Sequence, residues 1–273
     1  MQNIDESNDD YATYLKKVKA IYRERVNPKN RQERLIKFED RLDKSDLTRE
    51  IIIKHAPGKY MMQWRGLCLI KYPIDLGIYQ LMLQEIKPPT IIEIGTFNGG
   101  GAVWMADIMK IHGHKTHVYS MDIDLSYLEV GLNDRDDITF IHGDSFKISE
   151  AFPEDMLKNL PHPWLLIEDA HVNITNVLEY FDKYTQAGDY IVVEDTHPDI
   201  QTRLGFGLLK DLGEYEAIGT TWSMDPFKEF VKKHGNKYRV DPAYSDLNGF
   251  ATRAGKLHRA ELHYGHPNMA SSS

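Results

Sequence analysis

Two short acidic segments, each followed by a histidine, are the best candidates for a metal site in this sequence. Ile167–His171 contains Asp169, and Val193–His197 contains the pair Glu194 and Asp195; each segment closes an apolar run. Carboxylate oxygens without thiolates favour Mg²⁺, with Ca²⁺ or Mn²⁺ as substitutes. Three uncompensated carboxylates would also repel one another without a cation. We therefore predict that Asp169, Glu194 and Asp195 hold one divalent metal ion.

The alternation of side chains along a strand limits this prediction. Successive strand residues point to opposite faces, so Glu194 and Asp195 reach one ion only if the strand has ended before them. The alternative is that these carboxylates cap the following helices or pair with arginines. His171 and His197 each follow a predicted ligand by two residues. Of the two we predict His171 as the general base, with Asp169 beside it as the second catalytic residue.

A glycine-rich loop, Glu93–Gly101, directly follows an apolar run and opens a helical segment. Its spacing is not the G-x-G-x-x-G of dinucleotide sites, and the acidic Glu93 suits an amine-bearing or cationic ligand better than a pyrophosphate. We predict that this loop binds a nucleoside cofactor through backbone N–H groups that glycine leaves accessible. The residues assigned to it are Glu93, Gly95, Thr96, Asn98, Gly99 and Gly100.

Two further acids extend this prediction. Asp122, about twenty residues beyond the loop, occupies the place of a ribose-hydroxyl acceptor in nucleoside-binding folds. Asp144 lies beside Ser145 after the next apolar run, where it could accept an adenine amino group. S-adenosylmethionine meets these needs better than NAD. The alternative is that the glycines only form a tight strand-to-helix turn and the acids only cap helices.

The elements that must position these residues alternate between apolar runs and helical segments. The runs are rich in Ile, Val and Leu, which predicts strands buried on both faces of a doubly wound, mostly parallel Rossmann-like sheet. Such sheets bind ligands outside the carboxyl ends of their strands, where the acids lie. The predicted strands are Thr90–Gly95, His117–Asp122, Ile138–Asp144, Trp164–Asp169 and Asp189–Asp195. The predicted helices are Ile74–Ile86, Gly100–His112, Glu150–Asn159 and Asn173–Gln186. Lys237–Val240 and Gly249–Arg259 are expected to add an edge hairpin.

The flanking segments complete the expected organisation. Helical periodicity over Tyr11–Val26 and Arg31–His55 predicts an N-terminal helical extension, residues 1–59, before a catalytic domain, residues 60–273. The apolar stripe of the first helix would suit either a homo-oligomer or packing on the chain's own core. Gln63–Gly66 precedes the first strand of the domain, and we expect it to fold over the cofactor as a lid.

Composition and net charge argue against two classes of partner, nucleic acids and membranes. The 273 residues carry a formal net charge of −8, which argues against nucleic acid, and a mean hydropathy of −0.48 without a long apolar run argues against a membrane span. The acidic N-terminus does not resemble a secretory signal, and the single Cys68 cannot form an internal disulfide. We expect a cytoplasmic protein whose partner is a small molecule.

The order of the motifs resembles the cephalosporin hydroxylase family. The resemblance rests on four segments in order, and it spans about Tyr60 to His197. They are Tyr60–Leu67, Glu93–Gly100, Asp122–Ser126 and Glu168–His171. Gly101, where relatives often have Ser, and Glu168, where Asp is common, depart from the pattern.

This resemblance implies a class I S-adenosylmethionine-dependent methyltransferase fold. The family's best-known member acts in cephamycin 7-methoxylation with a Mg²⁺ site. Carried over, the resemblance assigns Glu93, Gly95 and the Gly99–Gly100 turn to the methionine part of the cofactor. It assigns Asp122 to the ribose and Asp144 to the adenine. Asp169, Glu194 and Asp195 become the metal ligands.

The expected activity is Mg²⁺-assisted O-methylation. The acceptor would be a small molecule with a hydroxyl beside a second oxygen donor, such as a catechol, a sugar diol or an α-hydroxy acid. Two alternatives stay open: a metal-dependent hydroxylase or oxygenase, and a non-catalytic S-adenosylmethionine-binding protein.

Overall fold

A computed structural model describes the chain in separate stretches and divides it into two units. The described residues are 11–25, 35–40, 58–129, 135–194, 224–234, 237–241, 244, 246–247, 250–251 and 257–259. The two units are Met1–Leu35 and Ile36–Ser273. In the first unit, helix α1 (Tyr11–Arg25) forms over most of the range that the periodicity predicts. None of the helices in the described stretches is long and apolar enough to cross a lipid bilayer.

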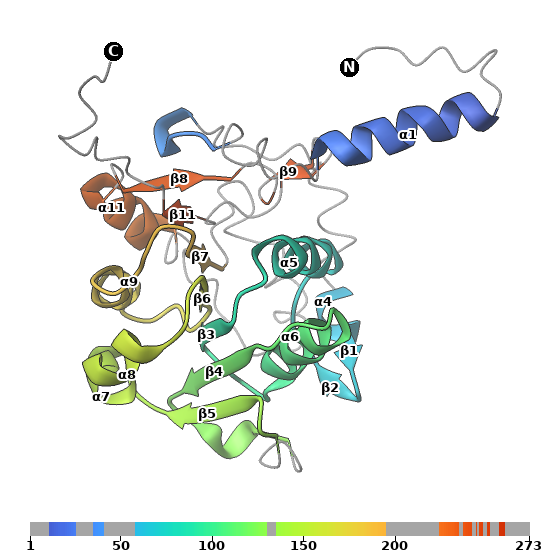
Figure 1. The fold of residues 1–273 in the computed structure, drawn as a ribbon. Helices are drawn as coiled ribbons and strands as arrows, with labels where there is room; N and C mark the ends of the chain where they lie inside the picture. Colours follow the sequence, from blue (N-terminus) through green and yellow to red (C-terminus); the bar gives the residue numbers. More distant parts are fainter. Residues whose placement is uncertain are drawn as a thin grey trace, which may run out of the picture. The chain divides into compact units, whose positions relative to one another are not determined.

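The second unit is built on a seven-stranded sheet with the strand order β5-β4-β3-β6-β7-β11-β8 (Figure 1). Five neighbouring strands run parallel; β11 pairs antiparallel with β7, and β8 pairs antiparallel with β11 at the edge of the sheet. The strands are β3 (Thr90–Ile94), β4 (His117–Asp122), β5 (Ile138–His142), β6 (Trp164–Glu168), β7 (Tyr190–Val193), β8 (Tyr238–Val240) and β11 (Leu257–Arg259). This confirms the predicted doubly wound, mostly parallel sheet.

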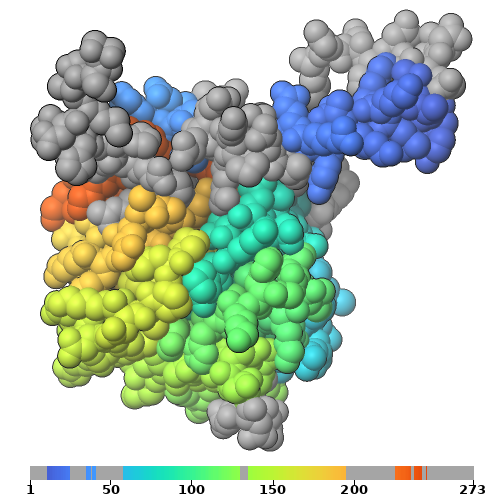
Figure 2. Space-filling model, in the orientation of Figure 1, coloured from blue at the N-terminus to red at the C-terminus, as the bar shows by residue number. Residues whose placement is uncertain are grey.

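Helices cover both faces of the sheet because its strands carry apolar side chains on both. In β3, Ile91 packs into the core under α5 and α6, whereas Ile92 and Ile94 pack into the core under α7, α8, α9 and α11. Figure 2 shows the surfaces of these layers, with α5 and α6 in teal and green and α7–α9 in yellow. The helices are α5 (Pro73–Ile86), α6 (Gly100–Ile111), α7 (Ile148–Ala151), α8 (Glu154–Asn159), α9 (Ile174–Asp182) and α11 (Met224–His234).

Smaller elements complete the described fold. The short helix α4 (Gly58–Met61) precedes a two-stranded hairpin, β1 (Gln63–Trp64) and β2 (Leu67–Cys68). The 3₁₀ turns are η1 (Phe38–Asp40), η2 (Leu125–Tyr127) and η4 (Ser145–Lys147). Ile36, which the sequence analysis places in the N-terminal extension, forms a bridge to Val240 of β8.

Two predicted elements differ in the structure, and a third is described only in part. The helix expected over Glu150–Asn159 is two short helices, because Pro153 has no N–H to donate and serves as the N-cap of α8. The strand expected over Gly249–Arg259 is also divided. β10 (Phe250–Ala251) pairs with β9 (Asp246–Leu247), and only β11 joins the main sheet. Most of the helix expected over Arg31–His55 lies outside the described residues.

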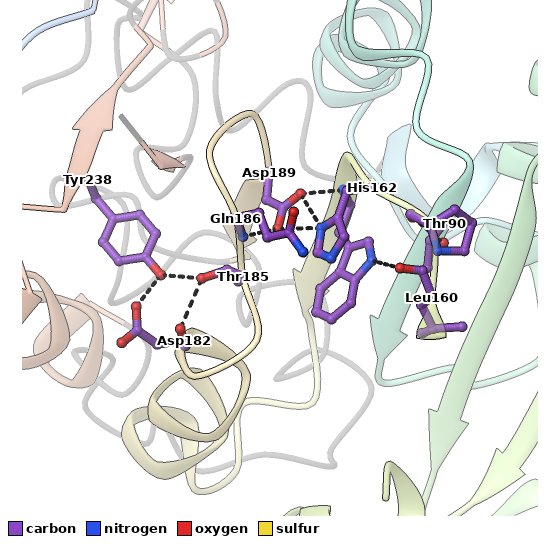
Figure 3. A network of polar contacts seen from close by, with 10 residues as sticks. Thr90, Leu160, His162, Asp182, Thr185, Gln186, Asp189 and Tyr238 are labelled. Atoms are coloured by element: carbon purple, nitrogen blue, oxygen red, sulfur yellow. Dashed lines mark hydrogen bonds and ion pairs between the residues drawn. The ribbon is translucent and has the colours of Figure 1, made fainter. Parts of the chain in front are cut away.

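A buried carboxylate, Asp189, binds backbone N–H groups at the amino ends of β6 and β7 (Figure 3). It accepts hydrogen bonds from the backbone N–H groups of Trp164 at 2.7 Å and Gln186 at 2.6 Å. The His162 ring nitrogen Nδ1 lies 2.9 Å from the same carboxylate. These contacts satisfy a buried charge and fix the strands at the end opposite the predicted site.

Candidate active site

The predicted site residues gather around one cavity of about 380 Å³ at the carboxyl ends of the parallel strands. Its volume is within the range of small-molecule sites. The predicted residues that line it are Glu93, Gly95, Thr96, Asn98, Asp122, Asp144, Ser145, Asp169, His171 and Glu194. Asp195 and His197 lie outside the described residues, so the structure says nothing of either.

The glycine loop brings the end of β3 against the end of β6. Gly95 has φ +106°, and a Cβ at this position would lie 2.7 Å from the backbone carbon of Asp169. Only glycine permits both the conformation and the approach. Gly99 and Gly100 do not line the cavity. Gly99 is the N-cap of α6, and Gly100 packs directly on the Cys68 carbonyl. Their contact with a cofactor stays a prediction.

Glu93 forms the buried floor of the cavity. Its carboxylate accepts a hydrogen bond from Ser120 Oγ at 2.5 Å. Burial raises the pKa of Glu93 to about 7, although the charge of Lys71 and the Ser120 hydrogen bond act in the opposite direction. A Cβ at Gly101 would lie 2.7 Å from Glu93 Oε1, so the glycine leaves space beside this carboxylate. A cationic amino group would fit here chemically.

The other two predicted cofactor acids order the loops around the cavity. Asp122 Oδ2 accepts a hydrogen bond from the Phe97 N–H at 2.8 Å, and Oδ1 accepts one from the Asp124 N–H at 3.2 Å. Asp144 Oδ1 accepts one from the Phe146 N–H at 2.9 Å. In the sheet, β3, β4 and β5 are neighbours, so Glu93, Asp122 and Asp144 follow one another across its edge.

A lysine that the sequence analysis did not select occupies the acidic end of the cavity. Lys71 Nζ lies 2.9 Å from Asp169 Oδ2 and 3.9 Å from Glu194 Oε1. Burial alone would lower the pKa of Lys71, but the charges of Asp169, Glu194 and Glu93 outweigh burial and raise this pKa above its ordinary value. Tyr79 donates its hydroxyl to Glu194 Oε1, and burial followed by the Glu194 charge raises the pKa of Tyr79.

The sequence did contain a signal for Lys71. It follows the apolar run Leu67–Ile70 immediately before Tyr72-Pro73. A lysine inside an apolar segment is rarely buried unless it is paired. The position of its partners, however, depends on contacts across about a hundred residues of sequence.

The donor set at this end suits a hard divalent cation in part. Asp169 and Glu194 follow adjacent strands, β6 and β7, and supply carboxylate oxygens. Among the described residues there is no group of three His, Cys, Asp or Glu side chains that could hold a metal ion. The third predicted ligand, Asp195, falls outside the described stretches.

His171 lies beside Asp169 at the wall of the cavity. Its Nε2 is 3.3 Å from Asp169 Oδ1. The backbone adopts φ +58°, a conformation that few non-glycine residues take, and the N–H of His171 donates to Glu168 Oε1 at 3.0 Å. The Glu168 side chain is fully buried, and burial raises its pKa to about 8. Glu168 therefore fixes the turn that presents His171.

The segment expected to act as a lid is anchored elsewhere. Trp64 Nε1 donates to Asp107 Oδ2 of α6 at 2.8 Å, and Arg65 Nε lies 2.8 Å from the same oxygen. Arg135 holds the other Asp107 oxygen at 2.7 Å. The β1–β2 hairpin thus packs on α6, and none of Gln63–Gly66 lines the cavity. The lid prediction is wrong because the buried Asp107 binds the hairpin.

Comparison with known proteins supports this interpretation of the fold. A rhamnosyl O-methyltransferase of Mycobacterium tuberculosis strain H37Rv is 32% identical over 198 residues, which cover 70% of this chain and 77% of that protein. The rhamnosyl O-methyltransferase of Mycobacterium leprae is 32% identical over 161 residues, covering 56% and 69%.

Solved structures of CmcI also match. The structure of CmcI with Mg and SAM is 30% identical, covers 74% of this chain and 77% of that chain, and superposes with a TM-score of 0.57. CmcI with SAH is 29% identical, with coverage of 73% and 82% and a TM-score of 0.54. The Rossmann-like methyltransferase fold and the resemblance to the cephalosporin hydroxylase family are therefore confirmed. The model of the family described as rhamnosyl O-methyltransferase/CmcI matches residues 58–248, and the chain belongs to this family.

Proposed function

We propose that this chain methylates a hydroxyl group of a small, sugar-like molecule that carries a second oxygen donor beside it. Membership of the family makes the chain an S-adenosylmethionine-dependent O-methyltransferase. The acceptor class, the metal and the role of each residue are our proposal. We place the methyltransferase domain over 60–273 after an N-terminal extension; the family match over residues 58–248 supports its beginning.

The observation that carries the proposal is the alignment of Glu93, Asp122 and Asp144 along one cavity at three neighbouring strand ends. S-adenosylmethionine carries a positively charged sulfur that holds the methyl group to be transferred. Glu93 would bind its amino group, Asp122 the ribose hydroxyls and Asp144 the adenine amino group. Gly95, Thr96, Asn98 and Ser145 line the cavity between these acids and would complete the cradle.

The acidic end of the cavity is the proposed metal site. Asp169 and Glu194, with Asp195 as the third ligand, would hold Mg²⁺, because hard carboxylate oxygens are its preferred protein ligands. When bound, the ion lowers the pKa of an acceptor hydroxyl and orients neighbouring oxygens. The carboxylates of Asp169 and Glu194 already bind one cation, the Lys71 ammonium, which supports their capacity to bind positive charge.

His171 and Asp169 would move the proton. The acceptor hydroxyl attacks the methyl carbon in line with the departing sulfur, and its proton passes to His171 Nδ1, the ring nitrogen that does not face Asp169. Asp169 Oδ1, 3.3 Å from His171 Nε2, orients the imidazole and stabilises its protonated form. Leu69 and Met121 are buried side chains that line the same cavity and would exclude water from the reacting atoms.

Calorimetric titration with S-adenosylhomocysteine tests the cofactor site. The wild type is expected to bind, and Asp122→Ala should weaken binding at least about tenfold, since it removes a ribose acceptor and the Phe97 contact. Asp124→Ala is the matched control: Asp124 follows two residues later and does not line the cavity. Equal affinities in the two variants would contradict the assignment of Asp122.

Transfer of a labelled methyl group tests the acceptor class. Purified enzyme is offered rhamnosides and other sugar diols, catechols and α-hydroxy acids, each with Mg²⁺ and with EDTA. Labelling of sugar diols that depends on the metal is the expected result. Labelling only of amines, or of no oxygen acceptor, would overturn the proposal.

A further inference from the structure

The acidic end of the cavity contains its own cation. Lys71 enters from the link between β2 and α5, and its side chain is only 6% exposed. We propose that the Lys71 ammonium is a built-in counter-ion of Asp169 and Glu194 and that it weakens divalent-cation binding to these two carboxylates. This inference rests on the proposed function, because it concerns the proposed metal site.

The contacts place Lys71 on the carboxylates themselves. Its Nζ is 2.9 Å from Asp169 Oδ2 and 3.9 Å from Glu194 Oε1. It also lies 5.4 Å from the centre of the Tyr79 ring, whose hydroxyl binds Glu194. The ammonium is therefore held by two carboxylates and an aromatic face together, and it is enclosed by protein rather than extended into solvent.

Burial makes this cation necessary when no metal is present. Glu93, Asp169 and Glu194 line one cavity, and a second acidic side chain there raises the cost of ionising the first. One ammonium offsets part of that repulsion and lets the carboxylates stay charged at adjacent strand ends. The site can thus stay assembled in the metal-free protein.

The same ammonium must repel a metal bound to the same carboxylates. A metal ion sits about 2.1 Å from its carboxylate oxygen, so an ion on Asp169 would lie within roughly 4–6 Å of Nζ. A dication and a monocation at that distance repel one another appreciably even in a polar environment. Together, Asp169, Glu194 and the Lys71 ammonium present the ion with a net charge of about −1. Without the ammonium, the two carboxylates present a net charge of about −2.

A second lysine in the cavity provides a matched control. Lys59 also lines the cavity, but its ammonium lies over aromatic rings, 5.0 Å from the centre of Tyr60 and 5.5 Å from that of Tyr72. Removing the Lys59 charge tests whether the loss of any positive charge from the cavity strengthens metal binding, or whether only the loss of the Lys71 ammonium, which contacts Asp169 and Glu194, does so.

The test measures Mn²⁺ binding directly, by the loss of the free-ion paramagnetic resonance signal and by calorimetry, without substrate. Lys71→Met and Lys71→Gln are both neutral, and the glutamine can still donate to Asp169 if the methionine variant does not fold. Both should bind Mn²⁺ at least about tenfold more tightly than the wild type, whereas Lys71→Arg and Lys59→Met should change affinity less than about threefold.

Thermal unfolding gives an independent readout. The neutral Lys71 variants should unfold at lower temperature than the wild type in EDTA and recover with Mn²⁺, which a purely structural role of Lys71 would not produce. If the neutral variants bind Mn²⁺ only as tightly as the wild type, or more weakly, this inference is overturned and the proposed function stays intact. No Mn²⁺ binding in any variant would overturn the metal part of the proposed function together with it. Retained binding of S-adenosylhomocysteine would show that the cofactor site still stands.

Discussion

The backbone N–H of His171 donates to the buried carboxylate of Glu168 at 3.0 Å, so a side chain at the end of β6 sets the turn that carries the proposed base. Glu168 is fully buried, and its Oε2 has no hydrogen-bond partner in the described part of the chain. This arrangement makes the stability of the fold depend on the protonation of one residue.

Glu168→Gln should flatten the pH dependence of stability. The folded protein raises the pKa of Glu168 from 4.5 to about 8, chiefly through burial. The folded state therefore binds the proton more tightly than the unfolded state, and the free energy of unfolding falls as pH rises from about 4.5 to about 8. Glutamine does not titrate, so the free energy of unfolding of the variant, relative to that of the wild type, should rise by up to a few kcal/mol between pH 5 and pH 8. Urea unfolding at the two pH values measures the difference, and parallel curves would contradict it.

Cofactor affinity should rise with pH through the pKa of Glu93. Burial raises this pKa to about 7, so in the free enzyme the carboxyl is largely protonated below pH 7. An ammonium group of the ligand favours the ionised form, and binding at lower pH must first displace the proton. The affinity for S-adenosylhomocysteine should fall up to about tenfold per pH unit below 7.

Glu93→Gln provides the control for that pH dependence. Calorimetry at pH 6 and pH 8 should give weak binding by the variant at both values, with little change between them. A wild-type affinity that is equal at the two pH values would show that Glu93 does not contact the ligand's amino group.

Gly95→Ala should unfold or strongly destabilise the domain. Alanine would have to adopt φ +106° and place its Cβ 2.7 Å from the Asp169 backbone, at a cost of about 3 kcal/mol or more. Gly77→Ala is the matched control, since Gly77 lies within α5 with no atom within 4 Å of the added Cβ. The Gly77→Ala substitution should raise the free energy of unfolding by about 0.5–1 kcal/mol. Similar urea midpoints for the two variants would refute the argument.

Most of the main sheet could be predicted because each of its parallel strands is recognisable from its own short apolar run. Runs such as Thr90–Ile94 and Trp164–Glu168 are apolar on both faces, and each lies within a residue of its predicted end. The acids that close them therefore reach the cavity as expected. Short helices were harder: Pro153 divides a segment whose apolar periodicity continues across it.

The rest of the site depends on contacts that no local pattern encodes. Lys71 and Tyr79 come from a segment before the first strand of the sheet, yet they contact Asp169 and Glu194. The hairpin around Arg65 was expected over the cofactor, whereas Asp107 of α6 holds it. Both outcomes follow from charges that pair across long sequence separations, which sequence periodicity does not reveal.

Replacing Asp107 should separate the hairpin's structural role from the cofactor site. Asp107→Ala removes the acceptor of Trp64 and one of the two carboxylates that Arg135 binds, which should cost about 1–3 kcal/mol. Arg65→Ala removes one largely exposed contact, and it should change stability by less than about 1 kcal/mol. Neither residue lines the cavity, so the folded variants should bind S-adenosylhomocysteine within about twofold of the wild type. A large loss of affinity in Arg65→Ala would restore the lid hypothesis.

His171→Asn should abolish most methyl transfer while the cofactor still binds. Asparagine tolerates the φ of +58° at this position, so the turn on Glu168 is kept and only the proton acceptor is removed. The loss of a general base should lower kcat by about 10²–10⁴-fold, and the affinity for S-adenosylhomocysteine should stay within about threefold of the wild type. His112→Asn, at the far end of α6 from the glycine loop, is the control and should leave kcat unchanged. A parallel fall of cofactor affinity and kcat in His171→Asn would instead make His171 a binding residue, and an unchanged kcat would leave proton removal to another group.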